Sequence, residues 1–104
     1  MLYIASNIKW LRKRSKKSQA LLAEQFIITR GALNSYEHGT AKPHLELLIK
    51  MADYFELSAD TFLRTDLRNY HEWQFRQLVE REKLAKLQIN GSLAELSRSN
   101  LLEY

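Results

Sequence analysis

Residues 28–39 read ITRGALNSYEHG, a helix-forming stretch with a glycine near its start. A glycine inside a helix lowers the stability of that helix by about 1 kcal/mol relative to alanine, so the presence of Gly31 needs a reason. Leu33 and Tyr36 point together on a helical wheel, and the opposite side carries Arg30, Gly31, Asn34, Ser35 and His38. That side is small and rich in hydrogen-bonding groups. It either admits another molecule at close range or is an ordinary solvent-facing surface that tolerates one glycine.

A second short helix is expected directly before this one. The pattern predicts helices over 18–26 and 29–38, with a tight turn around Ile27 and Ile28. Two short helices joined in this way form a helix-turn-helix, whose second helix lies in the major groove of DNA. There, arginine bonds guanine, asparagine bonds adenine, serine bonds less selectively, and glycine permits close approach. The predicted base contacts are Arg30, Gly31, Asn34 and Ser35.

The rest of the first 64 residues also has helical periodicity, and no stretch alternates as a strand does. Gly39 is predicted to close a helix in the left-handed conformation, and Pro43 to open the next one. Ser58 is predicted to cap a fifth helix that ends near Arg64. The fold class is therefore predicted to be all-α, with five short helices followed by further helical structure.

Composition excludes several classes of protein. The 104 residues, 45% of them hydrophobic, suit one domain with an appendage, and the absence of cysteine rules out disulfides and thiolate metal sites. No apolar run approaches the roughly 18 residues of a membrane span, and the first residues do not resemble a secretory signal. We expect a soluble cytoplasmic protein with no membrane partner. His38, His44 and His71 lack ligand spacing and no serine has a catalytic setting, so we expect no enzyme, metal or cofactor.

Charge is distributed unevenly along the chain. Residues 1–50 carry nine Lys and Arg against three Asp and Glu, and residues 51–104 carry seven against nine, which gives the net charge of +4. A basic first half favours contact with a polyanion, although a solvated surface is the alternative. Within the basic run after the first helix, Lys16 and Lys17 are predicted to lie near DNA phosphates, whereas Lys13 is assigned to the solvated surface.

Residues 67–104 are predicted to form a helical hairpin. The stretch 68–89 has the composition of a helix, Asn90 and Gly91 break it, and SLAE at 92–95 has the form of a capping box. The hairpin carries more apolar surface than it can bury alone, so it either folds back on residues 1–66 or dimerises. Dimerisation is the favoured hypothesis, through Trp73, Phe75, Leu78, Val79, Leu93 and Leu96.

A longer stretch, SQALLAEQFIITRGALNSYEHGTAKPHLELLIKMADYFELSADTFL at 18–63, resembles the lambda-repressor and Cro-like helix-turn-helix family, also called the XRE family. The matching elements are Ser18-Gln19, Leu22-Ala23, Thr29, Glu37-x-Gly39, Pro43, LIKMADYFELS and, in the first helix, IKWLR at 8–12. The order and spacing of these elements together carry the resemblance. Two positions depart from the family pattern: Ile27 stands where glycine is usual, and Leu21 where an acid is common.

The resemblance implies a five-helix DNA-binding domain over residues 1–66. It implies that Gln19, Thr29, Thr40 and Lys42 contact DNA phosphates, and that Arg12 and Glu37 form a partly buried structural ion pair. The expected function is that of a transcription regulator on double-stranded DNA, most simply a homodimeric repressor that reads an inverted repeat. The alternative is an antitoxin that binds a toxin through residues 68–104 and represses its own operon. An RNA-binding or chromatin-like protein is disfavoured, because the sequence offers no exposed aromatic platform.

Overall fold

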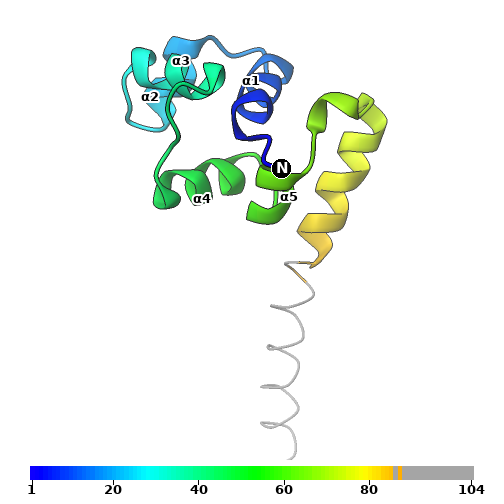
Figure 1. The fold of residues 1–104 in the computed structure, drawn as a ribbon. Coiled ribbons are helices and arrows are strands. Elements are labelled where there is room, and N and C mark those ends of the chain that lie inside the picture. The colour runs from blue at the N-terminus through cyan, green and yellow to red at the C-terminus, as the bar shows by residue number, and fades with distance from the viewer. Residues whose placement is uncertain (86, 88–104) are drawn as a thin grey trace, which may run out of the picture.

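The computed structural model describes residues 1–85 and residue 87, and within them all regular structure is helical (Figure 1). The elements are α1 (Ile4–Arg14), α2 (Gln19–Gln25), α3 (Arg30–His38), α4 (Leu45–Tyr54), α5 (Ala59–Arg64) and the 3-10 turn η1 (Leu67–Asn69). Residues 72–85 form one more helix, here called helix 72–85. The prediction of a helix from residue 68 is wrong at its start, because η1 ends at Asn69 and the chain is non-helical at Tyr70 and His71. The predicted all-α class is confirmed. No helix in this part of the chain is long and apolar enough to cross a membrane.

Four helices start at side-chain caps. The hydroxyl oxygens of Ser18, Thr29 and Ser58 accept hydrogen bonds from backbone amides in the first turns of α2, α3 and α5. The sequence predicts the cap at Ser58 for this reason, since a capped amide is no longer left without a partner. At α4 the cap is His44, whose Nδ1 accepts from the Leu47 amide.

Each of the first four helices is followed by a residue in the left-handed backbone conformation. Gly39 closes α3 with φ of 76°, as predicted, and Lys16, Ile27 and Glu56 follow α1, α2 and α4 with φ of 56°, 56° and 62°. After α2, the Ile27 amide donates to the Glu24 carbonyl and the Ile28 amide to the Ala23 carbonyl. This pair of bonds is a Schellman motif. The sequence prediction found only the glycine among these four.

One buried cluster holds these helices together. Its members come from each helix and from η1: Ile4, Ile8, Leu11, Leu22, Ala23, Leu33, Leu47, Met51, Ala52, Leu57, Phe62, Leu67, Phe75 and Leu78. Asn7 is fully buried within it. Its Nδ2 donates to the carbonyls of Phe62 and Thr65, both at 2.7 Å, and its Oδ1 accepts from the Leu67 amide at 3.1 Å. A buried polar side chain with its hydrogen bonds made fixes how α1 meets α5 and η1.

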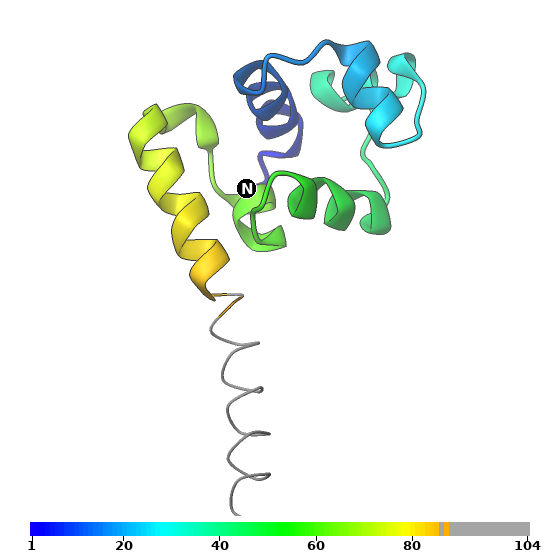
Figure 2. The same cartoon turned by 180° about the vertical axis from the view of Figure 1, so that it is seen from behind.

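Helix 72–85 packs against this cluster on the side of the domain opposite α2 and α3 (Figures 1 and 2). Phe75 meets the Trp10 ring edge-on, with 5.0 Å between centroids, and the Arg14 guanidinium lies 4.4 Å from its centroid. Glu82 accepts hydrogen bonds from the Ser58 amide and hydroxyl and from the Thr61 hydroxyl. The helix is therefore fastened at both ends of its inner face.

This packing corrects part of the predicted dimer surface. Phe75 and Leu78 are buried against their own chain, because their side of the helix covers the core, so they are not exposed interface residues. Val79 also packs on this core, whereas Trp73 is 61% exposed. The predicted second arm of the hairpin, with Leu93 and Leu96, lies outside the described residues. The boundary between 1–66 and 67–104 stays a prediction.

Candidate nucleic-acid interface

The outward face of α3 has no packed neighbour at its centre. Arg30, Gly31 and Asn34 are exposed and Ser35 is half-buried, as the wheel predicts. A Cβ built on Gly31 would meet no heavy atom within 4 Å outside its own helix backbone. The glycine is thus not required by packing inside the chain. Its absent side chain leaves space for something outside it.

The opposite face of α3 is anchored. Leu33 is fully buried, and Glu37 is 7% exposed. The Arg12 guanidinium donates from Nε and from its second terminal nitrogen to the two carboxylate oxygens of Glu37, at 2.7 and 2.9 Å. The hydrogen bond to Glu37 raises the pKa of Arg12 above its ordinary value. This two-pronged pair is the structural ion pair that the resemblance implies, and it sets the rotation of α3 relative to α1.

Gln19 links α2 to the exposed face of α3. Its Nε2 donates to Asn34 Oδ1 at 3.1 Å and lies 3.3 Å from Glu37 Oε1. Arg12 in turn donates to the Lys17 carbonyl at 3.0 Å, in the loop that precedes α2. A single network therefore connects the anchored face of α3, the start of α2 and a predicted base-reading side chain. The sequence placed Gln19 near a phosphate but did not reveal its bond to Asn34.

Three other predicted phosphate contacts flank α3. Thr29 caps the start of the helix by accepting from the Ala32 amide, which leaves its hydroxyl proton free to donate. Thr40, beyond the end of the helix, donates to the Ser35 carbonyl at 3.2 Å. Lys42 is exposed in the same loop. These residues lie at the two ends of the exposed face rather than on it.

The two lysines of the preceding loop behave differently. Lys16 is exposed. Lys17 is half-buried, and its ammonium donates to the Tyr54 hydroxyl and lies 4.8 Å from the centroid of that ring. Sequence reasoning grouped them because they are neighbours in a basic run. The structure separates them, since the left-handed Lys16 turns the chain and directs Lys17 toward α4.

The turn between α2 and α3 keeps a glycine-like backbone in spite of Ile27. This residue has φ of 56° and is 93% exposed. The departure from the family pattern therefore leaves the left-handed turn in place and puts an exposed β-branched side chain on it. Leu21, the other departure, is 58% exposed.

Candidate metal ligands do not gather in the described part of the chain. No group of three or more His, Cys, Asp or Glu side chains there could hold a metal ion. His38 Nδ1 instead lies 2.8 Å from the Asn34 carbonyl of its own helix, and His44 caps α4.

Comparisons with known proteins agree with this geometry. A family model described as helix-turn-helix matches residues 8–62. A Bacillus subtilis (strain 168) protein named uncharacterized HTH-type transcriptional regulator YqaE is 33% identical over 60 residues, which are 58% of this chain and 52% of that protein. The chain thus spans about half the length of this curated relative.

Two solved structures share the fold. One is a transcriptional regulator from Listeria innocua, with a TM-score of 0.60 and 24% identity over 92% of this chain and 95% of that one. The other is a chain of a SinR protein/SinI protein complex, with a TM-score of 0.56 and 23% identity over 98% of this chain and 93% of that one.

Proposed function

Because the chain belongs to the XRE-type helix-turn-helix family of DNA-binding transcription regulators, we propose that it binds a specific sequence of double-stranded DNA with α3 in the major groove. The observation that carries the proposal is the contrast between the two faces of α3. One face is anchored by Leu33 and the Arg12–Glu37 pair, and the other is open at Gly31. An anchored helix with an open polar face is suited to reading base edges.

The contacts divide into reading and positioning. Arg30, Asn34 and Ser35 read bases, and Gly31 lets the helix backbone approach them. The phosphate contacts are Gln19, Thr29, Thr40, Lys42, Lys16 and Lys17, of which Lys17 must first leave the Tyr54 hydroxyl. The hydrogen bond from Gln19 to Asn34 connects a phosphate contact to a base contact. Binding of a phosphate at Gln19 therefore orients the Asn34 amide.

We further propose that the regulator is a homodimeric repressor. One helix-turn-helix reads only a few base pairs, whereas a two-fold dimer sets two recognition helices about 34 Å apart. Helix 72–85 supports this proposal, because Trp73 and Leu84 are 61% and 54% exposed on it, and Leu87 beyond it is 63% exposed. Apolar side chains exposed in one region are typical of a protein contact. The expected operator is an inverted repeat.

Selection of bound DNA from a random pool, with the full chain, tests the function. We expect an inverted repeat with half-sites about ten base pairs apart. The Gly31→Glu variant is the control: its side chain meets nothing inside the protein, so it should fold, yet it should lose at least about 100-fold in affinity through clash and repulsion. Equal binding by this variant would show that α3 is not in the groove.

Light scattering of the same preparation tests the dimer. At micromolar concentration we expect a protein mass of twice that of one chain, both for the free protein and for the protein bound to DNA. A monomer in both states would overturn the homodimer. A toxin that co-purifies with the chain and binds it through residues 68–104 would favour the antitoxin alternative instead.

A further inference from the structure

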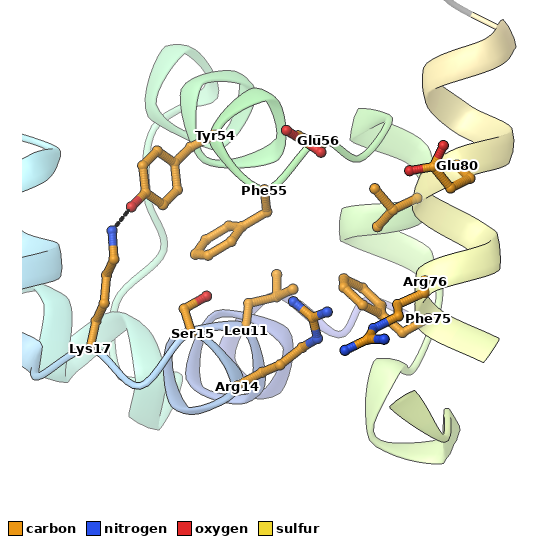
Figure 3. A pocket seen from close by; sticks show the side chains of 11 residues that line it. Leu11, Arg14, Ser15, Lys17, Tyr54, Phe55, Glu56, Phe75, Arg76 and Glu80 are labelled. Carbon is orange, nitrogen blue, oxygen red and sulfur yellow. Dashed lines mark hydrogen bonds between the residues drawn. The ribbon is translucent and has the colours of Figure 1, made fainter. Parts of the chain in front are cut away.

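A cavity of about 510 Å³ opens where α1, α4 and helix 72–85 meet (Figure 3). Its volume falls within the roughly 300–1,000 Å³ of small-molecule pockets. The lining residues come from three separate elements and the loops after them: Leu11, Arg14, Ser15, Lys17, Tyr54, Phe55, Glu56, Phe75, Arg76, Val79 and Glu80. None of them is a predicted base contact, so the cavity is distinct from the open face of α3; among them, Lys17 is the one residue also proposed as a phosphate contact.

The floor of the cavity is apolar. Leu11 and Phe75 are buried, and Phe55 and Val79 are half-buried beside them. Figure 3 shows Leu11 and Phe55 facing one another, with Phe75 on the neighbouring side. The Phe55 ring meets Tyr54 edge-on, with 4.9 Å between centroids, which holds both rings in place. A hydrocarbon group bound here would leave water and pack against these side chains.

Most charges around the cavity are already neutralised within the chain. Arg14 donates to both carboxylate oxygens of Glu72, at 2.9 and 2.5 Å, and Arg76 Nε lies 3.3 Å from the same group. Lys83 pairs with Glu56 at 2.8 Å and lies 3.9 Å from Glu80. The two lining acids therefore share Lys83, and the two lining arginines share Glu72.

Lys17 is the exception. Among the described residues, its side-chain hydrogen-bond partner is the uncharged hydroxyl of Tyr54. Because that hydroxyl accepts the bond from Lys17, its own proton stays available for donation. The ammonium and the phenol thus present two donors side by side at the edge of an apolar floor. An anion is the group that both donors favour, since hydrogen bonds from a charged donor to an anion are the strong ones.

We propose that this cavity binds a small amphipathic carboxylate. Its carboxylate group accepts hydrogen bonds from Lys17 Nζ and from the Tyr54 hydroxyl, and its hydrocarbon part lies on Leu11, Phe55 and Val79. A cationic ligand is disfavoured, because three cations (Arg14, Lys17 and Arg76) line the cavity against two acids, and Lys83 lies beside both of those acids.

Octanoate serves as the probe, and octylammonium as its counterpart of similar length and opposite charge. Each is titrated into the full ¹⁵N-labelled chain while amide chemical shifts are followed. Octanoate is expected to give saturable shifts at Ser15, Lys17, Phe55 and other lining residues, and octylammonium is expected to give none. Equal saturable binding of both probes, or octanoate shifts that miss the cavity, would overturn the proposal.

Two variants locate the carboxylate. Lys17→Gln should weaken octanoate binding at least about tenfold, and Tyr54→Phe should weaken it while leaving the ring packing intact. Lys13→Gln is the matched control, since it removes one exposed charge from α1 outside the lining and should leave the affinity unchanged. Circular dichroism melts establish that each variant is folded. Octanoate affinity that is the same in Lys17→Gln and Lys13→Gln would refute the assigned site.

Discussion

Helix α3 and helix 72–85 both have one face in the core and one face in water, but their outward faces differ in chemistry. The outward face of α3 is polar and has an open position at Gly31. Helix 72–85 buries Phe75 and exposes Trp73 and Leu84. Their inner attachments differ as well, because a buried ion pair anchors α3 at Glu37, whereas aromatic packing fastens helix 72–85.

The difference teaches that one small domain presents two kinds of surface. A polar face with room for close approach suits the grooves of DNA, where base edges offer hydrogen-bond groups. A polar face that also exposes large apolar side chains such as Trp73 and Leu84 suits another protein, where burial of hydrocarbon supplies free energy. The two helices lie on opposite sides of the domain (Figures 1 and 2), so we expect that both outward faces can be occupied at once.

The largest expected effect on stability distinguishes the buried face of helix 72–85 from its exposed face. Phe75→Ala should lower the free energy of unfolding by about 3–5 kcal/mol, because a buried ring that contacts Trp10 is lost. Trp73→Ala should change it by less than about 0.5 kcal/mol at concentrations where the chain is monomeric, and should weaken dimerisation instead. Urea unfolding and light scattering measure the two quantities. Equal destabilisation by both variants would erase the distinction between the faces.

The next effect sharpens the assignment of α3. Arg30→Ala should cost about 1–3 kcal/mol of binding on the selected operator and should relax specificity, because a base contact is lost. Lys42→Ala should weaken binding to every sequence and reduce the slope of affinity against salt by about one, because a phosphate contact is lost. Fluorescence anisotropy on operator and random DNA, over a range of salt, measures both. Uniform weakening by both variants would contradict the division into reading and positioning.

A smaller effect concerns the turn that sets α3 in place. Ile27→Gly should raise the free energy of unfolding by about 0.5–1 kcal/mol, because φ of 56° strains a β-branched residue and the exposed side chain contributes little burial. Ile27→Ala is the control, since it shortens the side chain but keeps the Cβ. Its free energy of unfolding should rise much less than that of Ile27→Gly. Urea unfolding measures both variants. A loss of stability in Ile27→Gly would show that the isoleucine side chain stabilises the turn.

The smallest effect tests the exposed pair that covers Phe75. The hydrogen bond from Arg14 holds the pKa of Glu72 below its ordinary value of 4.5. A lowered carboxylate pKa stabilises the fold above the unfolded value, and this contribution is lost as the pH falls through the folded value. Glu72→Gln should therefore melt slightly lower than the parent chain at pH 7, and the difference should vanish near pH 2. Thermal melts of both chains at pH 7 and near pH 2 measure this difference, and an equal difference at the two pH values would contradict the role assigned to the Arg14–Glu72 pair.

Local signals carried much of the prediction. Ser58 marked the start of α5, because its hydroxyl bonds an amide within the same few residues. Helical periodicity placed α2 and α3. Gly39 marked the end of α3 for a similarly local reason. The exposed face of α3 followed from helical periodicity alone. The Arg12–Glu37 pair followed from the family resemblance, since 25 residues separate its members.

The sequence by itself determined the helices of residues 1–64 and the chemistry of the α3 face, because each depends on residues within one or two helical turns. The tertiary structure decided the roles of Asn7, Lys17 and Glu82, whose partners lie 21 to 60 residues away. It also decided that Lys16, Ile27 and Glu56 adopt left-handed backbones. Residues other than glycine intrinsically disfavour the left-handed conformation. At Glu56 this preference is overridden because the next residue, Leu57, is fully buried in the core.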